Sequence, residues 1–284
     1  MAVHRVRSVV AQRLAVWTLL LFVCASASAQ TVREPAPILI QGAMVSETDR
    51  LVAGLDHPVL EKIGTWSFWR GALDGYPVIV SLTNKGAANA AAATMLAVER
   101  FHPVAIINQG TAGGHDPALH VYDIVIGTRA LNTGAFRSVF RPAGAGTAPT
   151  TWMPLDLLQE GSAVFGVHRL AGFEADPALL AVAHRMMGGY TRGRAVDGVI
   201  GSSDLWMDEI DLVAHLHETY GTTVEEMETA AAAQVSSMMT VPFIGIRILS
   251  DNITNGGTYE PKTGEACQEF VLTFVRAYRS TLPP

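Results

Sequence analysis

Cysteine is scarce in this chain of 284 residues, which has only Cys24 and Cys267. Cys24 lies in an N-terminal segment that we expect to be removed. Cys267 would then remain alone, so no intramolecular disulfide could form even in an oxidising compartment. We expect Cys267 to pack on the last helix rather than to act as a nucleophile.

Charge is also sparse. Charged residues make up 16% of the chain, the formal net charge is −6, and lysine and arginine form no cluster. An acidic chain without such a cluster argues against a surface that binds nucleic acid or an anionic membrane. Hydrophobic residues at 49% indicate an ordinary globular protein with a substantial core.

Several motifs of cofactor sites and nucleophiles are missing. The chain has no G-x-G-x-x-G fingerprint, no G-x-x-x-x-G-K-[ST] loop and no G-x-S-x-G elbow. His215 and His217 are two residues apart on an expected helix, so they face different sides and make a poor metal pair. We expect neither a metal site nor an organic cofactor.

The first 29 residues have the pattern of an export signal. Arg5, Arg7 and Arg13 give a basic start, the apolar run 14–24 follows, and Ala27-Ser28-Ala29 matches an A-x-A cleavage site. The apolar run is shorter than the roughly 20 residues that a transmembrane helix needs. We therefore expect a cleaved signal over 1–29, with an uncleaved anchor as the alternative, and a single exported domain over 30–284, periplasmic or secreted. Removal of three arginines and no acid changes the net charge from −6 to −9.

Strands and helices alternate along most of the remaining chain. Apolar, β-branched runs predict buried strands, and alanine-rich or amphipathic runs predict helices. The pattern predicts an α/β fold with three layers, in which a mixed, mostly parallel central sheet has helices on both faces. The strands are expected at 38–44, 104–108, 121–126, 195–201 and 243–249, with a hairpin over 66–82; the helices at 86–100, 177–187, 208–218 and 263–279; and loops at 109–114 and 137–154.

The stretch from Val224 to Asp251 organises the candidate site. Its alanine-rich first half predicts a helix that begins near Met227 and Glu228 and ends before Pro242. The apolar run that follows predicts a buried strand with Asp251 at its carboxyl end, which is the sheet edge where ligands bind in open α/β folds.

Glu226-Met227-Glu228 followed by Ser250-Asp251 resembles the nucleoside phosphorylase and nucleosidase superfamily, and within it the methylthioadenosine/S-adenosylhomocysteine nucleosidase branch. The resemblance extends from about residue 38 to residue 282.

Cleavage of an N-glycosidic bond passes through a cation-like sugar, which two carboxylates on opposite sides can assist. The resemblance implies that Asp251 is the general acid that protonates N7 of the purine, with a pKa that burial should raise. It also implies that Glu47 orients the attacking water and that Glu228 binds the ribose hydroxyls. We expect Glu225 and Glu226 to face solvent.

Further substrate contacts follow from the same resemblance. The segment 201–207 would form the purine pocket, where Trp206 is the candidate for stacking on the base and Ser203 replaces the usual glycine. Met207 belongs to the same segment of the purine pocket. The remaining candidates would lie near the sugar, the water or the 5′ alkylthio group: Met227, Thr83, Gly86, Met44 and Tyr259.

The choice of nucleophile depends on one position. Similar phosphorylases have an arginine two residues before the Gly-Thr of the central loop, because phosphate needs a strong cationic partner. Asn108 occupies that place here, so water is the expected nucleophile and the resemblance implies a homodimeric purine nucleosidase that acts on methylthioadenosine or S-adenosylhomocysteine. The alternatives are a phosphorylase, a nucleosidase with a different base preference, and a non-catalytic nucleoside-binding protein.

Overall fold

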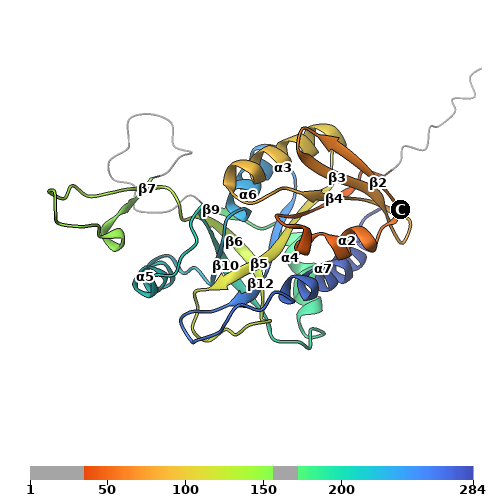
Figure 1. Ribbon diagram of the computed structural model, residues 1–284. Coiled ribbons are helices and arrows are strands. Elements are labelled where there is room, and N and C mark those ends of the chain that lie inside the picture. The colour runs from red at the N-terminus through yellow and green to blue at the C-terminus, as the bar shows by residue number, and fades with distance from the viewer. Residues whose placement is uncertain (1–34, 156–171, 284) are drawn as a thin grey trace, which may run out of the picture. The chain divides into compact units, whose positions relative to one another are not determined.

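The computed structural model describes residues 35–155 and 172–283, and the expected signal segment lies outside them (Figure 1). In the described part, one ten-stranded sheet has the order β11-β10-β6-β12-β5-β1-β4-β3-β2, with β9 paired to β6. The strands are β1 (Ile38–Gly42), β2 (Asp56–Ile63), β3 (Trp66–Leu73), β4 (Tyr76–Leu82), β5 (Ala105–Gly114), β6 (Ile124–Asn132), β9 (Gly172–Glu174), β10 (Ala195–Ser202), β11 (Val224–Glu226) and β12 (Phe243–Asp251).

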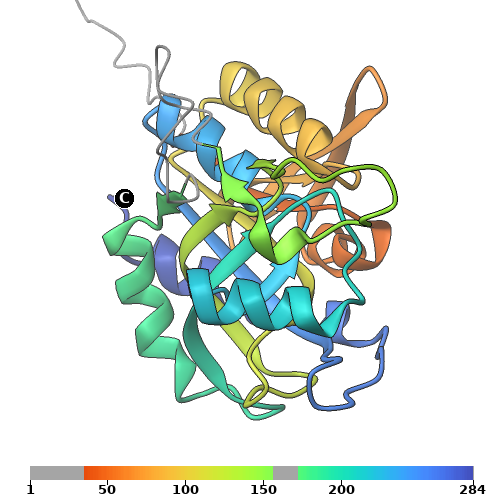
Figure 2. The same ribbon diagram turned by 90° about the vertical axis from the view of Figure 1, so that its left-hand side faces the viewer.

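Helices cover both faces of this sheet (Figures 1 and 2). Successive residues of β1 divide between the two layers, since Ile38 and Ile40 pack in the core with α4 and α7, whereas Leu39 packs in the core with α3 and α6. The predicted mixed sheet between two helical layers is confirmed. The helices are α2 (Asp49–Ala53), α3 (Ala87–Phe101), α4 (Pro177–Met187), α5 (Ile210–Tyr220), α6 (Thr229–Met238) and α7 (Thr263–Arg279), with short 3-10 turns η1 (Val45–Glu47) and η2 (Pro149–Thr151).

The short strand β11 closes part of the sheet into a ring. It pairs in parallel with β10 and antiparallel with β5, and the sheet path already connects β10 to β5 through β6 and β12. The carboxyl ends of β5 and β12 and the three residues of β11 therefore come together on one side of this ring.

One expected boundary was wrong at this ring, and one strand was not predicted. The predicted loop 109–114 is the second half of β5, because β12 and β11 supply hydrogen-bonding partners on both of its sides. Residues 224–226, placed in the run that precedes the predicted helix, form β11. The predicted loop 137–154 ends in the small β7 (Phe136–Arg137) and β8 (Met153–Pro154) pair.

Cys267 packs on α7 as expected. Its side chain is fully buried, and burial raises the pKa of the thiol to about 12. Such a thiol stays protonated at neutral pH and is a poor nucleophile. Among the described residues, no helix is both long and apolar enough to cross a membrane.

Candidate active site

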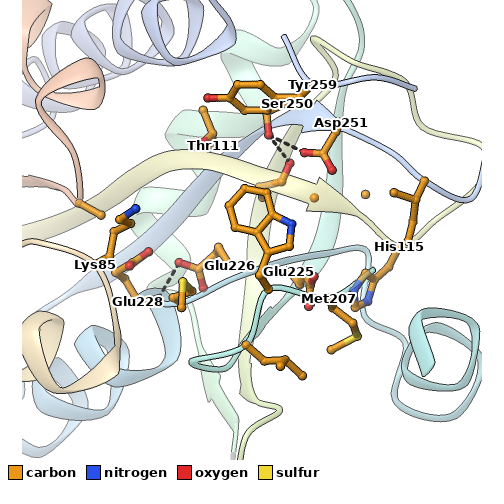
Figure 3. Close-up of a pocket in the computed structure, with 18 of the residues that line it drawn as sticks. Lys85, Thr111, His115, Met207, Glu225, Glu226, Glu228, Ser250, Asp251 and Tyr259 are labelled. Atoms are coloured by element: carbon orange, nitrogen blue, oxygen red, sulfur yellow. Dashed lines mark hydrogen bonds and ion pairs between the residues drawn. The ribbon is translucent and has the colours of Figure 1, made fainter. Parts of the chain in front are cut away.

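A cavity of about 380 Å³ lies where the strands of the ring end (Figure 3). Its walls come from the segment after β1, the end of β5, the strand β11 and the end of β12. All three predicted acids, Glu47, Glu228 and Asp251, line it. The structure thus places at one site three carboxyl groups that are far apart in the sequence.

Glu47 is held by four hydrogen-bond donors. The turn after β1 folds back through η1, so Oε2 of Glu47 accepts from the backbone nitrogens of Ala43 at 3.0 Å and Met44 at 3.2 Å. Oε1 accepts from the backbone nitrogen and the hydroxyl of Thr111 at 2.8 and 2.9 Å. A Cβ at Gly110 would lie 2.7 Å from Oε1, so this close approach requires glycine. The side chain is fixed as an acceptor at the cavity wall.

Asp251 is a half-buried carboxyl group at the end of β12. Burial raises its pKa above the ordinary value, although a hydrogen bond of 2.8 Å from the Ser250 hydroxyl opposes the shift. The raised pKa agrees in direction with the expectation for a general acid.

Glu228 stands at the start of α6 and is almost fully buried. Its Oε1 accepts a hydrogen bond of 2.8 Å from the backbone nitrogen of Gly86. Burial, with a contribution from the neighbouring Glu226, raises the pKa of Glu228 to about 8. The group therefore changes charge close to neutral pH and lies on the cavity wall.

The expectation that Glu226 faces solvent was wrong. It is 9% exposed and lies 2.5 Å from the guanidinium of Arg247, which is itself 1% exposed. Its carboxylate also accepts from the backbone nitrogens of Glu228 and Thr229, and from the Ser202 hydroxyl. Glu226 therefore anchors the start of α6. An arginine within the apolar strand 243–249 was the sequence signal for a buried acid, because a buried guanidinium needs an anionic partner.

Glu225 does not face solvent either. Its side chain is 11% exposed, lines the cavity, and lies 3.5 Å from the buried side chain of His115. The sequence offered no periodic signal for this pair, because the two residues meet only through the antiparallel pairing of β11 with β5.

The predicted apolar contacts fall in two groups. Met44, Met227 and Met207 line the cavity, and Met207 is 6% exposed. Trp206 also lines it but is 70% exposed, at the surface of the molecule. A residue that stacks on a bound base would be enclosed, whereas the indole of Trp206 is not enclosed in the single chain. Tyr259, expected near the 5′ group, lines the cavity as well.

Three predicted residues do not line the cavity. Thr83 is buried and its hydroxyl donates to the carbonyls of Gly42 and Asn84. Ser203 is buried and its backbone nitrogen donates to the carbonyl of Glu226. Gly86 acts through its backbone nitrogen on Glu228, with φ of +98°. These three residues contact neighbouring backbone or Glu228 and do not line the cavity themselves.

Two polar residues near the site have structural partners. Asn108, in the place of the phosphorylase arginine, is buried and accepts a hydrogen bond of 2.5 Å from Arg247. Asn252 begins an Asn-Ile-Thr glycosylation motif, but it is fully buried and its amide donates to the carbonyls of Asp116 and Leu119, so the motif is not accessible to glycosylation in this fold. Among the residues with described positions, no group of three or more His, Cys, Asp and Glu could hold a metal ion.

Known proteins are similar to this chain in sequence and in fold. A family model described as the phosphorylase superfamily matches residues 37–281. A 5′-methylthioadenosine/S-adenosylhomocysteine nucleosidase of Bacillus thuringiensis is 33% identical over 215 residues, which are 75% of this chain and 85% of that protein.

Solved structures of nucleosidases superpose on this chain. That of Colwellia psychrerythraea, in complex with adenine, has a TM-score of 0.67 at 26% identity and covers 86% of this chain and 96% of its own. That of Neisseria meningitidis, in complex with methylthio-immucillin-A, has a TM-score of 0.68 at 24% identity and covers 87% and 100%. The chain therefore belongs to the phosphorylase superfamily and, within it, to the 5′-methylthioadenosine/S-adenosylhomocysteine nucleosidases, which are N-glycosidic hydrolases.

Proposed function

We propose that the protein is an exported purine nucleosidase that hydrolyses 5′-methylthioadenosine, S-adenosylhomocysteine or a similar nucleoside to adenine and a thioribose. One observation carries the proposal: two carboxyl groups in different surroundings line the same cavity. Glu47 is fixed as an acceptor by four donors, and Asp251 is half-buried with a raised pKa. A half-buried carboxyl group with a raised pKa suits a proton donor, and a carboxyl group held only by donors suits an acceptor.

Each acid has one task in the proposed reaction. Asp251 donates its proton to N7 of the purine, which makes the base a better leaving group. Glu47 orients a water molecule toward the anomeric carbon and accepts its proton as the C–O bond forms. Glu228 binds the ribose hydroxyls, and Met227 lies against the sugar. The glycosidic electron pair leaves with the base, so atoms and charge balance without a cofactor.

The relatives support the identity of the substrate. The Colwellia protein was solved with adenine and the Neisseria protein with methylthio-immucillin-A. The cavity has apolar walls at Met44 and Tyr259 that suit a 5′ alkylthio group.

Water is favoured over phosphate as the nucleophile. The side chain of Asn108 accepts a hydrogen bond from Arg247, and Arg247 forms an ion pair with Glu226. Neither Asn108 nor Arg247 lines the cavity. Lys85 is a cation that does line it, so a phosphorylase is the alternative that needs a direct test.

Export and dimerisation are part of the proposal. The signal pattern at 1–29 supports export. Exposed apolar side chains at the cavity mouth, Leu205 and Trp206, with Ile210 nearby in sequence, support a second copy of the chain that covers the mouth. Sedimentation of the mature protein at micromolar concentration would show a dimer, and a monomer would contradict this part of the proposal.

The first experiment measures release of adenine from methylthioadenosine by the purified mature protein, with and without phosphate. Asp251→Asn removes the proposed acid, and Asp56→Asn, at an exposed position on β2, is the matched control. Release that is independent of phosphate, lost in Asp251→Asn and kept in Asp56→Asn would support hydrolysis with Asp251 as the acid. Strict dependence on phosphate would contradict the hydrolase, and an absence of release would contradict this substrate.

A further inference from the structure

The pair formed by His115 and Glu225 has no task in the proposed reaction. His115 is 1% exposed, and its Nδ1 is paired with the Thr222 hydroxyl at 2.7 Å. Its Nε2 faces Oε2 of Glu225 at 3.5 Å, and both atoms are buried without a hydrogen-bond partner among the described residues. Both side chains line the substrate cavity. A buried pair at this distance, with unused hydrogen-bonding capacity beside a ligand cavity, calls for a functional explanation.

Glu225 and Asp251 converge on one point of the cavity. Gly113 lies in β5, where it pairs with Glu225 of β11 on one side and with Asp251 of β12 on the other. A Cβ at Gly113 would lie 3.7 Å from Oδ2 of Asp251, 3.7 Å from Cγ of Glu225 and 3.9 Å from its Oε1. Because all three atoms lie near the point where that Cβ would be, both side chains approach over the same face of Gly113. The missing side chain of Gly113 leaves open the space between them.

The two oxygens of Glu225 differ in their surroundings. Oε2 is buried and turned toward His115. Oε1 is not fully buried, and it accepts no hydrogen bond within the described part of the chain. Oε1 is therefore the atom available to a ligand. In Figure 3, Glu225 is drawn between Glu226 and His115, with Asp251 above it.

Purine bases differ at the edge that contains N7. Adenine has the N7 acceptor next to the N6 amino donor, whereas guanine has N7 next to the O6 acceptor, as does any 6-oxopurine. A proton donor to N7 beside a carboxylate acceptor matches the first edge, and the carboxylate repels the second. We propose that Glu225, adjacent to Asp251, accepts a hydrogen bond from the 6-amino group of the base and so selects 6-aminopurines over 6-oxopurines. This inference rests on the proposed function in taking the ligand of the cavity to be a purine whose N7 faces Asp251.

His115 is a positioning residue in this arrangement. Donation from its Nε2 to Oε2 of Glu225 leaves Oε1 for the base, and Thr222 fixes the ring through Nδ1. A small closure of the 3.5 Å separation would bring the pair to hydrogen-bonding distance. The pair thus holds the acceptor in place.

Binding of free bases tests the inference without any turnover. Calorimetry with adenine, hypoxanthine and unsubstituted purine is compared for the wild-type protein, Glu225→Gln and Glu225→Met, with melting curves to confirm folding. The wild type should bind adenine more tightly than the other two bases. Glu225→Met should weaken adenine binding by about ten- to a hundredfold, the effect of one hydrogen bond to a charged group. Glu225→Gln keeps a neutral acceptor, so it should weaken adenine binding less, and it should strengthen hypoxanthine binding because its amide can donate to O6.

The ratio of adenine to hypoxanthine affinity is the decisive value, because Asp251 is the same in every variant. Glu225→Met should lower the ratio by removing the acceptor. His115→Phe should lower it as well, and His115→Gln, which keeps a donor, should restore it. A ratio that stays constant in Glu225→Gln and Glu225→Met overturns the inference while hydrolysis of methylthioadenosine still stands. A wild type that binds hypoxanthine as tightly as adenine overturns it directly, and a wild type that binds neither base overturns the proposed function too.

Discussion

Replacement of Arg247 by methionine should destabilise the protein strongly. Arg247 is 1% exposed and lies 2.5 Å from both Glu226 and the Asn108 side-chain oxygen. Methionine fills much of the volume but leaves the Glu226 carboxylate buried without its cation. Loss of one partner of a buried pair costs about 3 to 5 kcal/mol of unfolding free energy. For a domain of this size, that corresponds to a fall of about 6 to 20 °C in Tm.

A double-mutant cycle separates the ion pair from lost packing. Glu226→Gln keeps an oxygen for the amides at the start of α6 but leaves Arg247 without its carboxylate. The combination Arg247→Met with Glu226→Gln removes both charges, so its loss of stability should be smaller than the sum of the single losses by about 2 kcal/mol or more. Urea denaturation at pH 7 measures all four proteins. Additive losses, or a cost below about 1 kcal/mol for Arg247→Met, would refute the reasoning.

Three further predictions concern the cavity. Glu47→Gln should lower kcat by about a hundredfold or more with little change in KM, in steady-state assays of adenine release, because the water loses its proton acceptor; an unchanged kcat would exclude this role. The pKa of Glu228 is raised in the folded protein to about 8 from an ordinary 4.5, so the folded state binds the extra proton and stability should fall as pH rises between these values. Urea denaturation should show a free energy of unfolding that is lower at pH 9 than at pH 5 by on the order of a few kcal/mol, a difference that Glu228→Gln should lack. The same difference in both proteins would contradict the assignment. Gly113→Ala should weaken adenine binding without lowering Tm, because the added methyl group lies at ordinary contact distance from Asp251 and Glu225 but occupies the space between them; calorimetry and melting curves check both parts.

The sequence predicted the elements whose local signals agree with their surroundings. The helix expected at 177–187 matches α4, with Asp176 as its N-cap, and the helix expected at 263–279 matches α7. The strand that ends at Asp251 was also predicted, and with it the sheet edge that forms the cavity. In each case hydrophobic periodicity and end signals point to the same structure.

Long-range pairing explains what the sequence did not reveal. Nothing local marks residues 109–114 as a strand, because their pairing with β11 and β12 depends on segments more than a hundred residues away. The same pairing buries Glu225 and Glu226, which resemble surface acids when only their neighbours in the chain are considered. Three acids of the candidate site were found through family resemblance, whereas the His115 and Glu225 pair became visible only in three dimensions.

The two-sided pairing of β11 has a consequence for folding. This strand of three residues joins β5 and β10, and the cavity that it completes draws on residues from Ala43 to Tyr259. Contacts between such distant segments carry a high cost of loop closure and tend to form late. Nucleosidase activity would therefore appear only when nearly the whole domain has folded, which makes the recovery of activity during refolding a measure of complete folding rather than of local structure.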